Sequence, residues 1–140
     1  MKLGLSSRMT LLASAFVMAM MICHRQPAVS DEQPAFDAAS VEFFQTKVKP
    51  LLEARCFECH GPDAKVLKGG LSLASRAATL KGGDSGAAIV PGKPDESLLI
   101  KAVKYIDFEM PPKSRMPDGE IAILTEWVKR GAPWSKEDTP

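Results

Sequence analysis

Two cysteines and a histidine form the most reactive cluster of side chains in the sequence. Cys56 and Cys59 are separated by two residues, and His60 directly follows the second cysteine. This spacing is typical of the covalent attachment of c-type haem. Each thiol can add to a haem vinyl group to form a thioether, and the adjacent histidine can then bind the iron as its proximal ligand. The pattern predicts haem c, one per chain and covalently bound.

Three other interpretations of this cluster stay open. A structural zinc site usually needs four cysteine or histidine ligands, and the sequence after residue 30 offers only these three. A thioredoxin-type redox pair normally follows a strand in a βαβ unit, and no convincing strand pattern is present. A disulfide between the two cysteines would close a very short loop, so it would restrain the unfolded chain little.

The first thirty residues have the features of a secretory signal. Lys2 and Arg8 precede an apolar stretch at 11–23, and the small residues Ala28 and Ser30 occupy the positions that a signal peptidase reads. We therefore expect residues 1–30 to be a signal peptide that is cut after Ser30, and the mature protein to be periplasmic or otherwise exported. The alternative is an uncleaved N-terminus that tethers the protein to the membrane.

Removal of this leader leaves few candidates for any chemistry. Fifteen basic and seventeen acidic residues remain, which gives a net charge of −2, and such a balance does not favour binding to nucleic acid. His60 is the last histidine, so a second axial ligand to the iron would be a methionine, either Met110 or Met116. Pro111 and Pro112 fix the backbone after Met110, which favours Met110 over Met116. Core packing is the alternative role for either methionine.

The hydrophobic pattern predicts an all-α fold of four to five short helices with long loops. We expect a disordered lead-in at 31–39, a single domain at 40–135 and a C-terminal tail at 136–140. Ser40 is the predicted cap of the first helix, and Pro50 either kinks this helix or begins a second one at 51–60. The later helices are predicted at 76–81, capped by Ser75, at 94–104, and after a cap at Asp118. Long loops are predicted at 82–94 and 107–117.

Several phrases in the sequence together resemble the planctomycete-type cytochrome c domain. They are Cys56-Phe57-Glu58-Cys59-His60-Gly61-Pro62-Asp63-Ala64, Lys68-Gly69-Gly70-Leu71, Gly82-Gly83-Asp84-Ser85-Gly86, Val90-Pro91-Gly92, Ser97-Leu98-Leu99, Met110-Pro111-Pro112 and Trp127-Val128-Lys129-Arg130-Gly131-Ala132-Pro133-Trp134. The resemblance extends over residues 43–134. It implies a cytochrome c-like fold in which the first and last helices cross beside the haem. It also implies that Met110 is the distal iron ligand.

The expected function is that of a monohaem c-type cytochrome, which carries single electrons between exported redox partners. We do not expect an enzyme, because no acid–base or nucleophile cluster accompanies the haem site. Four cations flank the predicted ligand-bearing loops and could attract an acidic redox protein: Lys65, Lys68, Lys113 and Arg115. The alternatives are a haem-based redox or gas sensor with a labile sixth ligand, and a thiol–disulfide oxidoreductase without haem. A membrane is an expected partner only if the leader is uncleaved.

Overall fold

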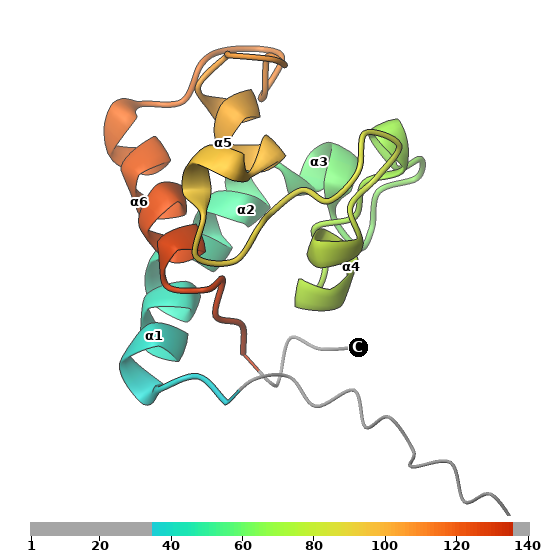
Figure 1. The fold of residues 1–140 in the computed structure, drawn as a ribbon. Coiled ribbons are helices and arrows are strands. Elements are labelled where there is room, and N and C mark those ends of the chain that lie inside the picture. The colour runs from blue at the N-terminus through green and yellow to red at the C-terminus, as the bar shows by residue number, and fades with distance from the viewer. Residues whose placement is uncertain (1–34, 136–140) are drawn as a thin grey trace, which may run out of the picture. The chain divides into compact units, whose positions relative to one another are not determined.

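The computed structural model describes residues 35–135, and this part of the chain is helical (Figure 1). It contains no β-strand within these residues, and its only β-type pairing is an isolated bridge between Gly83 and Gly86. The prediction of an all-α fold is therefore confirmed. The predicted signal peptide and C-terminal tail lie outside the described residues. Between residues 35 and 135, no helix has the length and apolar character that a membrane crossing needs.

The helical elements follow one another in the order in which they are labelled in Figure 1. They are α1 (Ala38–Phe43), the π-helix η1 (Phe44–Val48), α2 (Lys49–Arg55), α3 (Phe57–His60), the 3-10 turn η2 (Lys68–Gly70), α4 (Arg76–Lys81), the 3-10 turn η3 (Pro94–Glu96), α5 (Leu98–Val103) and α6 (Asp118–Lys129). α1, η1 and α2 form one uninterrupted helical segment, and short loops and turns connect most of the others.

The first helix begins earlier than predicted, and Ser40 does not cap it. Asp37 occupies the cap position with extended backbone, and its carboxylate accepts a hydrogen bond from the backbone N–H of Ser40 at 2.9 Å. An aspartate at this position satisfies a backbone donor that has no partner within the helix. α1 therefore starts at Ala38, inside the lead-in predicted at 31–39.

The helical segment breaks at the first cysteine. Pro50 lies in the first turn of α2, where a missing N–H costs no helical hydrogen bond, so the second of the two predicted outcomes at this proline is observed. α2 then ends at Arg55, because the backbone of Cys56 (φ −124°, ψ −34°) leaves the helical region. The predicted continuous helix at 51–60 is wrong in this respect. Gly61 ends α3, as predicted.

An aromatic cluster joins the first helical segment to α6. The ring of Phe44 lies 4.5 Å from that of Trp134 and 6.2 Å from that of Trp127, measured between centroids. Trp127 is fully buried, and its indole N–H donates to the carbonyl oxygen of Pro133 at 2.8 Å. Such aromatic contacts add to the free energy of burial. The packing of the first segment on the last helix, which the resemblance implied, is therefore present.

α6 buries the face that its periodicity predicts, but its cap differs. The predicted core residues of this helix are all buried: Ile121, Leu124, Trp127 and Val128. Asp118 is the first residue of the helix, and Pro117 occupies the cap position. The carboxylate of Asp118 instead accepts an ion pair from Arg115 at 2.8 Å. The predicted cap at Asp118 is therefore wrong.

The long loop at 82–94 passes through the core before α5. Ala88 and Ile89 are buried within it. The helix predicted at 94–104 is divided into η3 and α5, because Ser97 has an extended backbone between them. The hydroxyl of Ser97 donates to the carbonyl oxygen of Lys93 at 2.9 Å and accepts from the N–H of Val90 at 2.9 Å, so it ties the loop to α5. Ser75 caps α4, as predicted.

Candidate functional site

The two cysteines and the histidine lie on a single helical turn. Cys56 is the junction between α2 and α3, while Cys59 and His60 end α3. The N–H groups of Cys59 and His60 both donate to the carbonyl oxygen of Cys56, at 3.2 and 2.9 Å. Both cysteines are free thiols and are partly exposed. The turn therefore presents two thiols three residues apart, beside an imidazole ring.

The imidazole of His60 has one nitrogen already engaged. Its Nδ1 lies 3.1 Å from the carbonyl oxygen of Leu71. Because a carbonyl oxygen can only accept a hydrogen bond, Nδ1 carries the proton in this pair. The lone pair of a neutral imidazole is then on Nε2. A histidine that binds a metal commonly donates its other ring N–H to a carbonyl in this way, which fixes the ring's orientation and raises its basicity.

The segment that carries this carbonyl is itself held by hydrogen bonds. The N–H of Leu73 donates to the carbonyl oxygen of His60 at 2.7 Å, so residues 60 and 71–73 are joined through both backbone and ring. The N–H of Leu71 donates to the carbonyl oxygen of Lys68 at 3.2 Å, within η2. Leu73 is buried in the hydrophobic core. The proximal side of the candidate site is therefore ordered by bonds within the chain.

The two candidate methionines have different surroundings. Met116 is 2% exposed and belongs to the hydrophobic core cluster, as gap-filling methionines do. Met110 is 37% exposed and lies on the loop between α5 and α6. Its N–H donates to the carbonyl oxygen of Ala102 at 3.2 Å, and the hydroxyl of Tyr105 donates to the carbonyl oxygen of Pro111 at 2.6 Å. Met110 is thus the more accessible sulfur, on a loop that two hydrogen bonds fix.

An ion pair joins this loop to the cysteine motif. The ammonium group of Lys113 lies 3.1 and 3.2 Å from the two carboxylate oxygens of Glu58, which stands between the two cysteines. Sequence reasoning treated Lys113 only as a partner-facing cation and missed Glu58. The loop's other cation, Arg115, is paired with Asp118. Among residues 35–135, neither Lys65 nor Lys68 is engaged in an ion pair.

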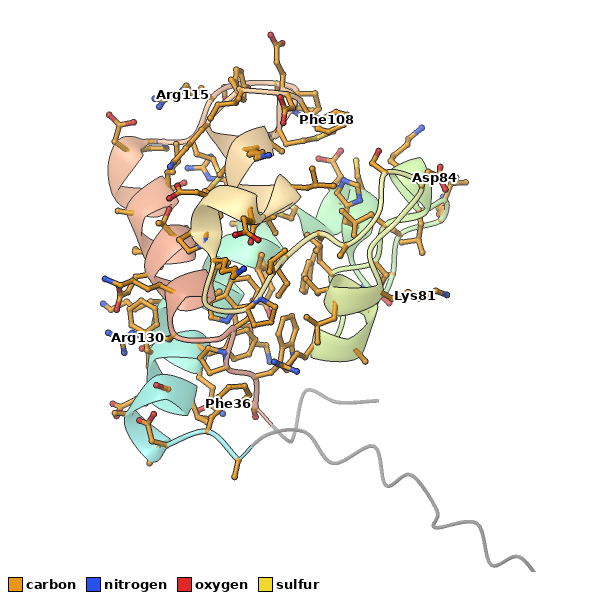
Figure 2. The ribbon with its side chains drawn as sticks, in the orientation of Figure 1. Phe36, Lys81, Asp84, Phe108, Arg115 and Arg130 are labelled. Carbon is orange, nitrogen blue, oxygen red and sulfur yellow. The ribbon has the colours of Figure 1, made fainter. Side chains whose placement is uncertain are left out.

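Exposed apolar side chains are concentrated on the two loops that accompany these residues. They are Val66, Leu67, Ile106, Phe108 and Met110. Val66 and Leu67 follow α3, and the other three precede α6; Figure 2 shows Phe108 and Arg115 on the latter loop. Water contact with large apolar side chains is unfavourable, and an apolar group that covered them would contribute free energy.

These observations fit a covalently attached haem. A haem needs thiols for attachment, an imidazole nitrogen for its iron and apolar side chains against its faces. Cys56 and Cys59 provide the thiols, Nε2 of His60 provides the nitrogen, and the two loops provide the apolar side chains. Met110 could supply a sulfur as a second iron ligand.

The environment of Cys56 argues against a thiol–disulfide oxidoreductase. Burial raises the pKa of its thiol from the ordinary value of 9.0 to about 11, and the nearby charge of Arg55 opposes this only in part. A redox-active cysteine needs a lowered pKa, because the thiolate is the nucleophile. Cys56 therefore remains protonated at neutral pH. The zinc interpretation also lacks ligands, since residues 35–135 contain no group of three or more metal-binding His, Cys, Asp or Glu side chains.

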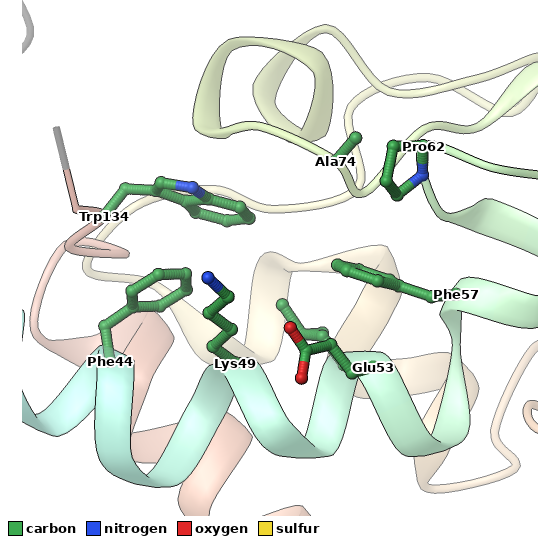
Figure 3. A pocket seen from close by; sticks show the side chains of 8 residues that line it. Phe44, Lys49, Glu53, Phe57, Pro62, Ala74 and Trp134 are labelled. Carbon is green, nitrogen blue, oxygen red and sulfur yellow. The ribbon is translucent and has the colours of Figure 1, made fainter. Parts of the chain in front are cut away.

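A hollow of about 200 Å³ lies beside the motif but is separate from it (Figure 3). Phe44, Phe57 and Trp134 form apolar walls, with Lys49 and Glu53 among the lining residues. Phe57 is its only contribution from the Cys-x-x-Cys-His motif. The hollow therefore does not bring together the thiols, the imidazole and Met110.

This combination of residues is typical of helical domains that attach haem covalently. Residues 56–114 match the model of the family described as Planctomycete cytochrome C, which confirms the resemblance predicted from the sequence. The match starts at Cys56 and includes Met110, and it is shorter than the predicted range of 43–134. A cytochrome c domain implies a haem-binding electron carrier, and such domains are typically exported. No curated protein and no solved structure matches the chain.

Proposed function

We propose that this protein is a monohaem c-type cytochrome with a cytochrome c-like fold. It carries single electrons between exported redox partners and does not catalyse a reaction of its own. The observation that carries the proposal is the hydrogen bond between Nδ1 of His60 and the carbonyl oxygen of Leu71, one residue away from the second of two free thiols. This bond leaves Nε2 as the ring's metal-binding atom.

The side chains of the site have separate tasks in this proposal. The haem, when bound, supplies an iron that takes up and releases one electron. Cys56 and Cys59 hold the group covalently, and His60 binds the iron in an orientation that Leu71 fixes. Met110 is the distal ligand. A methionine opposite a histidine raises the reduction potential relative to two histidines. The exposed apolar side chains of the two loops would shield the group from water.

The proposed redox partner is acidic at its contact surface. Lys65 and Lys68 surround the exposed Val66 and Leu67, on the loop that follows the attachment motif. Lys113 and Arg115 are each balanced by a carboxylate, so the uncompensated positive charge beside the motif is on Lys65 and Lys68. Unpaired charges of one sign attract an oppositely charged surface and raise the rate of association.

Co-expression with a cytochrome c maturation system tests this function. The expected product is a chain that keeps its haem stain on a denaturing gel and gives a low-spin visible spectrum in both oxidation states. A Cys56→Ser, Cys59→Ser double variant is the matched control and should lose the stain. A wild-type chain without covalent haem would contradict the proposal. Rapid binding of carbon monoxide by the reduced protein at neutral pH would favour the sensor instead.

A further inference from the structure

Two glycine-containing loops pack against each other next to the carbonyl that holds His60. One is η2 (Lys68–Gly70), and the other begins at Gly82, directly after α4. The N–H of Asp84 donates to the carbonyl oxygen of Gly69 at 2.8 Å, and Gly83 and Gly86 exchange two further hydrogen bonds at 3.1 and 2.9 Å. The two loops are thus in direct backbone contact, one residue before Leu71.

Gly83 is the point of closest approach. A Cβ atom at this position would overlap the carbonyl oxygen of Gly69 and lie 2.9 Å from the N atom and 3.1 Å from the Cα atom of Leu71. The φ angle of Gly83 is not in the left-handed region, unlike those of Gly82 and Gly86. The backbone would therefore accept a side chain here without conformational strain. Glycine is required because of the space that Leu71 and Gly69 occupy.

We infer that Gly83 is a positioning residue for the proximal ligand: the absence of its side chain lets the loop after α4 lie directly against Leu71 and so fixes the carbonyl oxygen that accepts the hydrogen bond from His60. This inference rests on the proposed haem function. The chain of contacts runs from Gly83 to the backbone of Leu71, and from the oxygen of Leu71 to Nδ1 of His60, 3.1 Å away.

The consequence is an effect on the iron from a residue that does not contact it. A hydrogen bond from Nδ1 makes the imidazole more electron-donating, which stabilises the oxidised iron. A methyl group at position 83 would push Leu71 away and lengthen this bond. The imidazole of His60 would then donate less, and the reduction potential would become more positive.

Gly83→Ala, measured in the haem-loaded protein, tests the inference. We expect a positive shift of the reduction potential and faster deuterium exchange of the Nδ1 proton of His60, followed by NMR in the reduced state. Gly92→Ala is the matched control. Gly92 has a φ of +80° and no atom within 4 Å of a built Cβ, so its substitution strains a turn without moving Leu71. It should lower stability and leave the potential unchanged.

Three outcomes are informative. An unchanged potential and an unchanged exchange rate in Gly83→Ala would overturn the inference, and so would equal shifts in Gly83→Ala and Gly92→Ala. If Gly83→Ala does not accumulate, wild-type exchange decides. The Asp84 amide and the Nδ1 proton of His60 should then exchange at similar rates, and a much faster Asp84 amide would contradict a joint role. Absence of haem from the wild type would instead reject the proposed function itself.

Discussion

The hydroxyl of Tyr105 donates a hydrogen bond to the carbonyl oxygen of Pro111 at 2.6 Å, and Pro111 directly follows Met110. Tyr105 itself has a φ of 61°, which is uncommon for a residue with a side chain. Its left-handed backbone ends α5 and turns the chain into the loop that carries Met110. The tyrosine therefore both starts this loop and holds its centre.

Tyr105→Phe should loosen the distal loop without removing the proposed ligand. We expect the loss of about 1 kcal/mol of stability, the usual net value of one hydrogen bond. Because a looser loop releases a weak ligand more often, carbon monoxide should bind the reduced protein faster. Thr46→Val is the control, since it removes a hydroxyl–carbonyl bond of 2.8 Å from the first helical segment. Equal carbon monoxide rates in wild type and Tyr105→Phe would count against the role of this bond.

Trp127→Phe should destabilise the protein more than Trp134→Phe. Both indoles are buried in the cluster with Phe44, but only that of Trp127 makes a hydrogen bond within residues 35–135. Trp127→Phe leaves the buried carbonyl oxygen of Pro133 without this donor, which costs about 1 to 3 kcal/mol beyond the lost packing. Urea denaturation of the two haem-loaded variants measures the difference. The reverse order of stability would show that the hydrogen bond contributes little.

Substitution of Lys65 and Lys68 should alter electron exchange with charged reagents. Lys65→Gln, Lys68→Gln should slow oxidation of the reduced protein by ferricyanide several-fold at low ionic strength, because two uncompensated positive charges are removed. Glu58→Gln, Lys113→Gln keeps the net charge and should change this rate little. Stopped-flow kinetics over a range of salt concentrations provides the comparison. A similar slowing in both double variants would mean that the Glu58–Lys113 pair also contributes.

Cys56 should titrate at high pH in a chain produced without haem. Burial disfavours the charged thiolate, which raises the pKa to about 11. The folded state then holds the proton more tightly than the unfolded state, so stability is constant below about pH 9 and falls as the pH rises towards 11. Thiolate absorbance in a Cys59→Ser variant measures this pKa. A midpoint at or below 9 would show that the thiol is not buried as described.

The reactive residues of the site could be predicted because their types and spacing carry the information. Cys56, Cys59 and His60 are adjacent in sequence, and one helical turn is enough to bring them together. Met110 required a different argument, since it lies fifty residues away. The burial of Met116, at 2% exposed, could not be read from its neighbours in sequence, because it depends on the packing of helices that are distant along the chain.

The contacts that position these residues were not predictable in the same way. The carbonyl of Leu71 belongs to the backbone, so no residue type signals its role. Glu58 and Lys113 form an ion pair across a separation of 55 residues, and either charge alone reads as ordinary surface. The cap of α1 was placed at Ser40 because serine is a common cap, yet Asp37 was an equally good candidate three residues earlier.

Paired substitutions of the two methionines provide the most direct test of the iron ligation. Leucine has nearly the same volume as methionine but no sulfur, so it removes a ligand with little change in packing. We predict that haem-loaded Met110→Leu loses the methionine-to-iron charge-transfer band of the oxidised protein, and that Met116→Leu keeps it. A retained band in Met110→Leu, together with its loss in Met116→Leu, would contradict the assignment of Met110 as the distal ligand.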